Sequence, residues 1–175
     1  YAWSNGDTSA TTTLGQSDVG NTISVTLTYT DDQSSSNTIT LTAASDTDNV
    51  NDAGSGLSLA SDGDVADPDE DDTLSVTGTL ADDDGVTNAA PTYQWSRASS
   101  AISGATSSSY MLVQADVGSI MSVASTYTDD LSSSNTITLT AASDTDNVND
   151  AATASISGTA TEDETLTASA ADEDG

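Results

Sequence analysis

A segment of twenty residues, SSSNTITLTAASDTDNVNDA, occurs at residues 34–53 and again, without a single change, at residues 132–151. The shift of 98 residues (132 − 34 = 98) also carries the earlier motifs DVG and YTDD onto second copies. A partial third copy follows, because EDETLTASAADEDG at residues 162–175 parallels EDDTLSVTGTLADDDG at residues 70–85. Repetition at a fixed spacing is typical of tandem structural units. We predict the C-terminal part of one repeat at residues 1–50, a complete repeat at 51–148 and the N-terminal part of the next at 149–175.

Apolar residues alternate with Thr and Ser in several short windows, which is the pattern of half-buried β-strands. In TISVTLTYT, for example, Ile23, Val25 and Tyr29 fall on one face. The windows NTITLTA, TLSVTGTLA, TYQW and SYMLV repeat this alternation, and no window has a helical period. About seven such strands in one repeat predict an all-β, antiparallel β-sandwich. We expect Trp3 and Trp95 in the core, and we expect Asp18 and Asp116 to bind backbone amides.

The charge and the missing residue types narrow the possible functions. The net charge is −28, with one Lys or Arg, no His and no Cys, so nucleic acids and anionic membranes are unfavourable partners. No apolar run is long enough to insert into a membrane. Nucleophilic Ser or Thr catalysis needs a nearby base such as His or Lys, and both are absent. We therefore do not expect an enzyme, and we expect the chain to be part of a longer one.

The ordered series YQW, ISGATSSSY, ADVG, YTDD, VNDA and SISGTATEDETL runs through the chain. In this order the motifs resemble the immunoglobulin-like repeats of very large bacterial surface adhesins. The resemblance implies immunoglobulin-like sandwiches, secretion to the cell surface, tandem arrays of extender domains and linkers stiffened by calcium.

Acidic residues cluster where a sandwich of this order would place its ends. The last strand ends at the C-terminal pole, so DTDNVND is expected to link one repeat to the next and to face the acidic turn and the last hairpin of that next repeat. Carboxylate and amide oxygens are the ligands that Ca²⁺ prefers. The predicted ligands at the first junction are Asp46, Asp48, Asn49, Asn51, Asp52, Asp82, Asp84, Asp129 and Asp130; those at the second are Asp144, Asp146, Asn147, Asn149, Asp150, Asp172 and Asp174.

This arrangement is similar to cadherin junctions, in which an Asp-x-Asp pair meets acidic and Asn ligands on a linker. The alternative is that the same residues are solvated turn residues, because Asp and Asn are common in turns. Asp67, Asp69 and Asp71 mimic the start of an EF-hand loop, but Asp72 stands where that loop needs Gly. We therefore regard this run as a weaker candidate.

The leading hypothesis is an extracellular spacer array, stiffened by Ca²⁺, whose partners are neighbouring repeats of the same chain or filament. Surface glycans would then be bound through other regions. The alternatives are a fibre subunit assembled head to tail by strand complementation, a carbohydrate-binding module around the loop at Arg97, and adaptation to salt without a specific metal. An unfolding midpoint that responds to millimolar Ca²⁺ but not to molar NaCl would separate the first hypothesis from the last.

Overall fold

The computed structural model describes residues 1–172 and Asp174, and it is built almost entirely of β-strands. It contains two compact units, Tyr1–Asp52 and Ala53–Gly175. Every pairing between the named strands is antiparallel. The prediction of an all-β, antiparallel chain is therefore confirmed. No helix in the described part of the chain is long and apolar enough to cross a membrane.

The first unit contains one three-stranded sheet with the order β1-β2-β3. Its elements are β1 (Ala2–Trp3), the short 3-10 helix η1 (Gln16–Asp18), β2 (Thr22–Thr30) and β3 (Ser36–Asp46). The alternation in β2 buries Ile23 and Val25. On the same face, Tyr29, near the other end of β2, is 49% exposed, and Leu41 of β3, which pairs with Val25, is 57% exposed. The apolar face of this sheet is therefore only partly covered.

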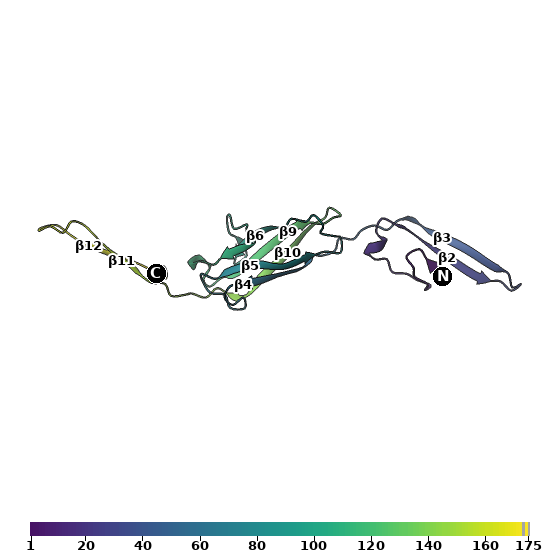
Figure 1. Cartoon of the computed structure of the whole chain (residues 1–175), viewed down its shortest axis with the longest axis horizontal. Coiled ribbons are helices and arrows are strands. Elements are labelled where there is room, and N and C mark those ends of the chain that lie inside the picture. Colours follow the sequence, from purple (N-terminus) through teal and green to yellow (C-terminus); the bar gives the residue numbers. More distant parts are fainter. Residues whose placement is uncertain (173, 175) are drawn as a thin grey trace. The chain divides into compact units, whose positions relative to one another are not determined.

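The second unit contains two sheets that pack as a sandwich, with β4, β5, β9 and β10 as its long strands (Figure 1). One sheet has the order β4-β5-β8 and the other the order β10-β9-β6-β7. The bounds are β4 (Ser55–Ser61), β5 (Thr73–Ala81), β6 (Thr92–Arg97), β7 (Ser100–Ala101), β8 (Ser109–Met111), η2 (Gln114–Asp116), β9 (Ile120–Thr128) and β10 (Ser134–Asp144).

The core of the sandwich lies between its two sheets and is centred on Trp95. Leu74 of β5 meets Trp95 of β6 and Val123 of β9, and all three are 0% exposed. The ring of Tyr110 stacks on that of Trp95 with the centroids 5.7 Å apart. The indole N–H donates a hydrogen bond to the carbonyl of Ser107 at 2.9 Å. Trp95 is thus a core residue, as predicted, and its buried ring is not available to stack on a sugar.

A separate two-stranded hairpin, β11 (Thr153–Ser157) and β12 (Thr167–Ala171), follows the sandwich (Figure 1). Both strands are exposed along their whole length. The hairpin corresponds in sequence to β4 and β5, which are covered by the second sheet of the sandwich. The division of the chain into repeats of the immunoglobulin type stays a prediction.

Candidate functional site

Carboxylates gather at both ends of the sandwich. The pairing of Ser55 with Ala81 marks one end of the β4–β5 hairpin, and the pairing of Ser61 with Leu74 marks the other. At the first end lies a group that we call the Asp84 group, and at the second end lies the Glu70 group. In each group, carboxylate oxygens lie within 4.8 Å of one another. The members of the Asp84 group are Asp82, Asp84 and Asp129, and those of the Glu70 group are Glu70, Asp150 and Asp174.

The Asp84 group joins the turn after β5 to the turn after β9. Asp84 is 4% exposed and Asp129 is 5% exposed. Asp129 is fixed by its own turn, because its Oδ1 accepts hydrogen bonds from the amides of Leu131 at 2.9 Å and Ser133 at 2.8 Å. The amide of Asp84 donates to Oδ1 of Asp82 at 2.9 Å. The carboxylates of Asp82 and Asp129 are thus held in place by local backbone bonds.

Tyr127 is the neutral partner of the Asp84 group. Its hydroxyl donates a hydrogen bond to Oδ2 of Asp82 at 2.5 Å, and the residue is 3% exposed. Burial and the neighbouring carboxylates raise the pKa of Tyr127 to about 12. A Cβ atom at Gly54 would lie 1.7 Å from this hydroxyl oxygen, which explains why glycine stands there. Tyr127 therefore stays protonated and ties β9 to the acidic turn.

Asp130, a predicted ligand, lies outside the Asp84 group. Its Oδ2 accepts a hydrogen bond from the amide of Thr87 at 3.1 Å, and its own amide donates to the carbonyl of Gly85 at 3.0 Å. Hydrogen bonds from Thr87 lower the pKa of Asp130. In this structure Asp130 fastens the loop between β5 and β6.

The Glu70 group combines the sandwich, the segment after β10 and the end of the β11–β12 hairpin. Glu70 is 3% exposed, and its amide donates to the carbonyl of Asp146 at 2.8 Å. With the Gln114 amide oriented to donate, its nitrogen lies 2.7 Å from Oε2 of Glu70. The amide of Asp150 donates to Oδ2 of Asp174 at 3.0 Å. Carboxylates from three separate segments therefore meet at this end of the sandwich.

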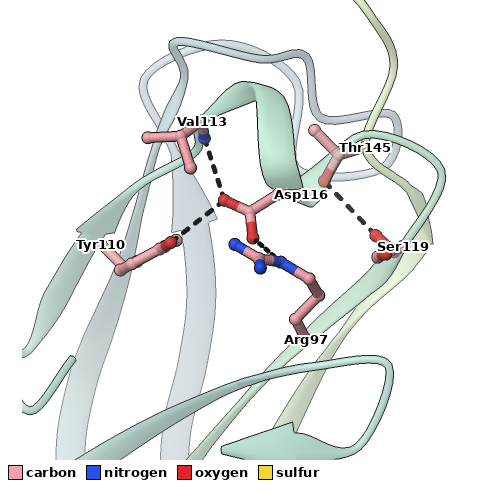
Figure 2. Close-up of polar contacts among 6 residues, drawn as sticks. All are labelled: Arg97, Tyr110, Val113, Asp116, Ser119 and Thr145. Atoms are coloured by element: carbon pink, nitrogen blue, oxygen red, sulfur yellow. Dashed lines mark hydrogen bonds and ion pairs between the residues drawn. The ribbon is translucent and has the colours of Figure 1, made fainter. Parts of the chain in front are cut away.

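Asp116 holds η2 in place beside the Glu70 group. Figure 2 shows its carboxylate between three donors: Arg97 Nε at 2.6 Å, the Tyr110 hydroxyl at 3.1 Å and the Val113 amide at 2.9 Å. Asp116 is 0% exposed, and it raises the pKa of Arg97 through this contact. The expectation that Asp116 binds a backbone amide is confirmed, as is the same expectation for Asp18, which accepts from Gly15 at 3.0 Å.

The segment that links the sandwich to the hairpin begins later than predicted. Asp46 and Asp144 are the last residues of β3 and β10 rather than linker residues. Beyond β10, Thr145 pairs with Val117, and its side chain and amide both donate to the carbonyl of Ser119 (Figure 2). Asp146 forms a bridge with Asp69. Backbone pairing continues past the end of β10 because the turn after η2 and the loop before β5 supply partners for Thr145 and Asp146.

The structure brings together only part of the predicted ligand set. Among the described residues, Asp150 and Asp174 meet at the second junction, and the amide of Asp174 donates to Asp172 Oδ1 at 3.1 Å. The residues of that junction that lie outside the Glu70 group are Asp144, Asp146, Asn147, Asn149 and Asp172. The first-junction residues Asp46, Asp48, Asn49, Asn51 and Asp52 belong to one unit and the Asp84 group to the other, so the predicted contact between them stays a prediction.

Sequence reasoning missed Glu70. It weighed the neighbouring Asp67, Asp69 and Asp71 as an EF-hand mimic, and none of these belongs to a described carboxylate group. A signal for Glu70 was present, because Glu162 stands at the same place in the partial third copy. The position of Glu70 is set by its loop. Backbone hydrogen bonds between this loop and Asp146 hold the loop against the segment that follows β10.

No protein-family model matches this chain, and no curated protein or solved structure matches it either.

Proposed function

We propose that this chain is a spacer segment of a large secreted bacterial adhesin or extracellular filament, and that Ca²⁺ stiffens the junctions between its repeats. The observation that carries the proposal is the Glu70 group. It takes Glu70 from the sandwich, Asp150 from the link and Asp174 from the next hairpin. One cation held by these three carboxylates would tie together segments that the backbone alone joins only through residues 147–152.

The chemistry of the donors favours Ca²⁺ over other cations. Ca²⁺ takes about six to eight oxygen ligands in a flexible geometry, whereas the chain offers no thiolate or imidazole for softer metals. Three carboxylates within 4.8 Å of one another repel one another, and the repulsion weighs most on Glu70, the buried one. A divalent cation would remove this repulsion and would also lower the effect of a net charge of −28.

Thermal unfolding with millimolar Ca²⁺ and with chelator, at one ionic strength, tests whether the folded chain binds Ca²⁺. At a free Ca²⁺ concentration of about 100 times the Kd, binding stabilises the folded state by about 2.7 kcal/mol. For a domain of about 60–100 residues, such as the sandwich, the midpoint of thermal unfolding rises by about 4–8 °C for each kcal/mol of added stability. Glu70→Gln is expected to lose most of this rise, while Asp71→Asn, an exposed neighbour outside the group, keeps it.

Small-angle X-ray scattering of the same samples tests whether Ca²⁺ stiffens the chain as a spacer requires. We expect the largest dimension of the chain to increase and its distribution to narrow when Ca²⁺ is added, because a fixed junction removes bent conformations. An equal effect from NaCl at matched ionic strength would favour salt adaptation instead. An unfolding midpoint that is unchanged by Ca²⁺ would rule out a stabilising calcium site.

A further inference from the structure

The part of the sandwich formed by β6, β7 and β8 differs in charge from the rest of the chain. No Asp or Glu occurs at residues 85–115, although the chain has 29 acidic residues among 175. This stretch contains β6, β7, β8 and the loops between them. Its one charged side chain, Arg97, is paired with Asp116. An anionic chain that approaches this side of the sandwich therefore meets little repulsion from it.

β8 is an edge strand on this side. It stands last in the order β4-β5-β8, and among the described strands β5 alone pairs with it. The Leu112 amide donates to the carbonyl of Asp72 at 2.8 Å, so the backbone of Leu112 faces the β5 side. The hydrogen-bonding direction alternates along an antiparallel strand, so the amides and carbonyls of Ser109 and Met111 point away from β5. These groups are placed to pair with a further strand.

A groove lies between β8 and the loop that precedes it, with a volume of about 350 Å³. Ile102 and Ala105 pack against the core cluster and give the groove an apolar lining, to which Ser107 and Ser109 add hydroxyl groups. Met111, which is 57% exposed, lines the groove on the β8 side. An extended strand laid along β8 would thus find backbone partners and an apolar surface to cover.

We propose that β8 of one copy of this chain pairs antiparallel with β8 of a second copy across a twofold axis at Tyr110, so that two β4-β5-β8 sheets join edge to edge. Ser109 of each copy pairs with Met111 of the other, which brings the outward amides and carbonyls opposite one another. An edge strand with unpaired backbone groups is a template for such pairing. The contact is lateral, so it suits spacers that lie side by side, and it does not rest on calcium.

Charge favours a second copy in this orientation. The acidic loop before β5 joins β8 at one end, where the Asp71 amide donates to the carbonyl of Leu112 at 3.2 Å. Antiparallel pairing puts this loop of each copy at opposite ends of the contact, whereas parallel pairing would place the two loops side by side. Residues 85–115 of the two copies then face each other, and most of the charge of −28 on each copy lies elsewhere. A cationic peptide would be drawn to those other regions instead.

Disulfide trapping in the full 175-residue chain tests the pairing, because the chain has no cysteine of its own. Ser109→Cys and Met111→Cys chains are mixed with chelator and a mild oxidant in about 1 M NaCl, where the Debye length is about 3 Å and repulsion between copies is weak. Opposite residues of a hydrogen-bonded antiparallel pair have Cα atoms about 5.5 Å apart, which suits a disulfide. We expect the mixture to give a disulfide dimer of about 35 kDa (2 × 17.5), several times more than either chain gives alone.

Thr77→Cys is the matched control, because Thr77 is exposed on β5, the central strand of the same sheet. Mixed with Met111→Cys, it should give only a background yield. An excess of unchanged chain should lower the yield of the Ser109–Met111 dimer by competing for β8. An excess of Met111→Pro should lower it much less, because Pro removes the outward amide and is tolerated in an edge strand. Circular dichroism checks that each variant keeps its strands.

Three results would overturn the proposal. The first is an equal dimer yield for the Ser109–Met111 mixture and the Thr77–Met111 control. The second is a preference for disulfides between identical positions, which would contradict the proposed register. The third is a dimer yield that an excess of unchanged chain does not lower. Chelator is present throughout, so these outcomes are independent of the proposed calcium site.

Discussion

The loop that precedes β2 and the loop that precedes β9 are each held by a buried aspartate, but the side chain that donates to this aspartate differs between them. In the first unit, Asp18 accepts hydrogen bonds from the Gly15 amide at 3.0 Å and from Asn5 at 3.4 Å. In the sandwich, Asp116 accepts from the Val113 amide at 2.9 Å and from Arg97 at 2.6 Å. The bond to the backbone is common to both loops, and the partner changes from a neutral amide to a guanidinium.

Burial explains the change of partner. Asp18 is 6% exposed and Asp116 is 0% exposed. A fully buried carboxylate needs a charged, well-aligned partner, whereas one that keeps some contact with water is satisfied by neutral donors. The only Arg of the chain, whose side chain is 30% exposed, supplies a charged donor to the fully buried Asp116. The aspartate thus shapes the loop in both units, and its burial determines whether it needs a cationic partner.

Asp116→Ala is expected to have the largest effect. It leaves Arg97, Tyr110 and the Val113 amide without their acceptor, and the loss of these three hydrogen bonds to a buried carboxylate destabilises the sandwich by about 3–5 kcal/mol. Hydrogen exchange measured by mass spectrometry reports the sandwich and the first unit separately. Asp18→Ala is the matched control, with an expected loss of about 1–2 kcal/mol in the first unit. Equal losses in the two units would contradict the burial argument.

Arg97→Asn is expected to destabilise the sandwich less than Asp116→Ala. It places at residue 97 the side chain that Asn5 has at the corresponding position of the first unit. The Arg97 side chain is 30% exposed, so the loss is that of a charged hydrogen bond, about 1.5–3 kcal/mol. Tyr110→Phe keeps the stacking on Trp95 and removes the other side-chain donor. The two changes share Asp116, so a double-mutant cycle should give a coupling of about 0.5 kcal/mol or more. Strict additivity would show that the donors act independently.

Tyr127→Phe is expected to have the smallest effect, about 1 kcal/mol at neutral pH, because it removes one hydrogen bond to Asp82. The pKa of Tyr127 is raised to about 12 in the folded state, above about 10 in the unfolded chain. The stability that Tyr127 contributes is therefore complete below about pH 10 and is lost as the pH rises through about 12.

Urea unfolding between pH 8 and pH 12 should show this loss for the unchanged chain and a flatter profile for Tyr127→Phe. Tyr29→Phe is the matched control, because Tyr29 is 49% exposed and should change stability little. A steep alkaline loss that persists in Tyr127→Phe would assign the titration to another group.

The sequence predicted the strands well, because alternation along a strand is a local property. β2 and β3 have the bounds of β9 and β10 at a shift of 98 (22 + 98 = 120; 36 + 98 = 134). It also placed Asp82, Asp84 and Asp129 at one end of the sandwich. It could not find the place of Glu70, because this depends on a backbone bond to Asp146 between segments 76 residues apart (146 − 70 = 76).

The order of residues along the chain fixes which positions alternate and which carboxylates stand in turns. It did not determine what is buried. The same NTITLTA strand and YTDD turn occur twice, yet Tyr29 is 49% exposed and Tyr127 is 3% exposed. Strand periodicity is fixed by the residues of the strand itself, whereas burial is fixed by the sheet that packs against it. For this reason, the packing of a second sheet distinguishes the copy of the segment that joins a core from the copy whose apolar side chains are exposed.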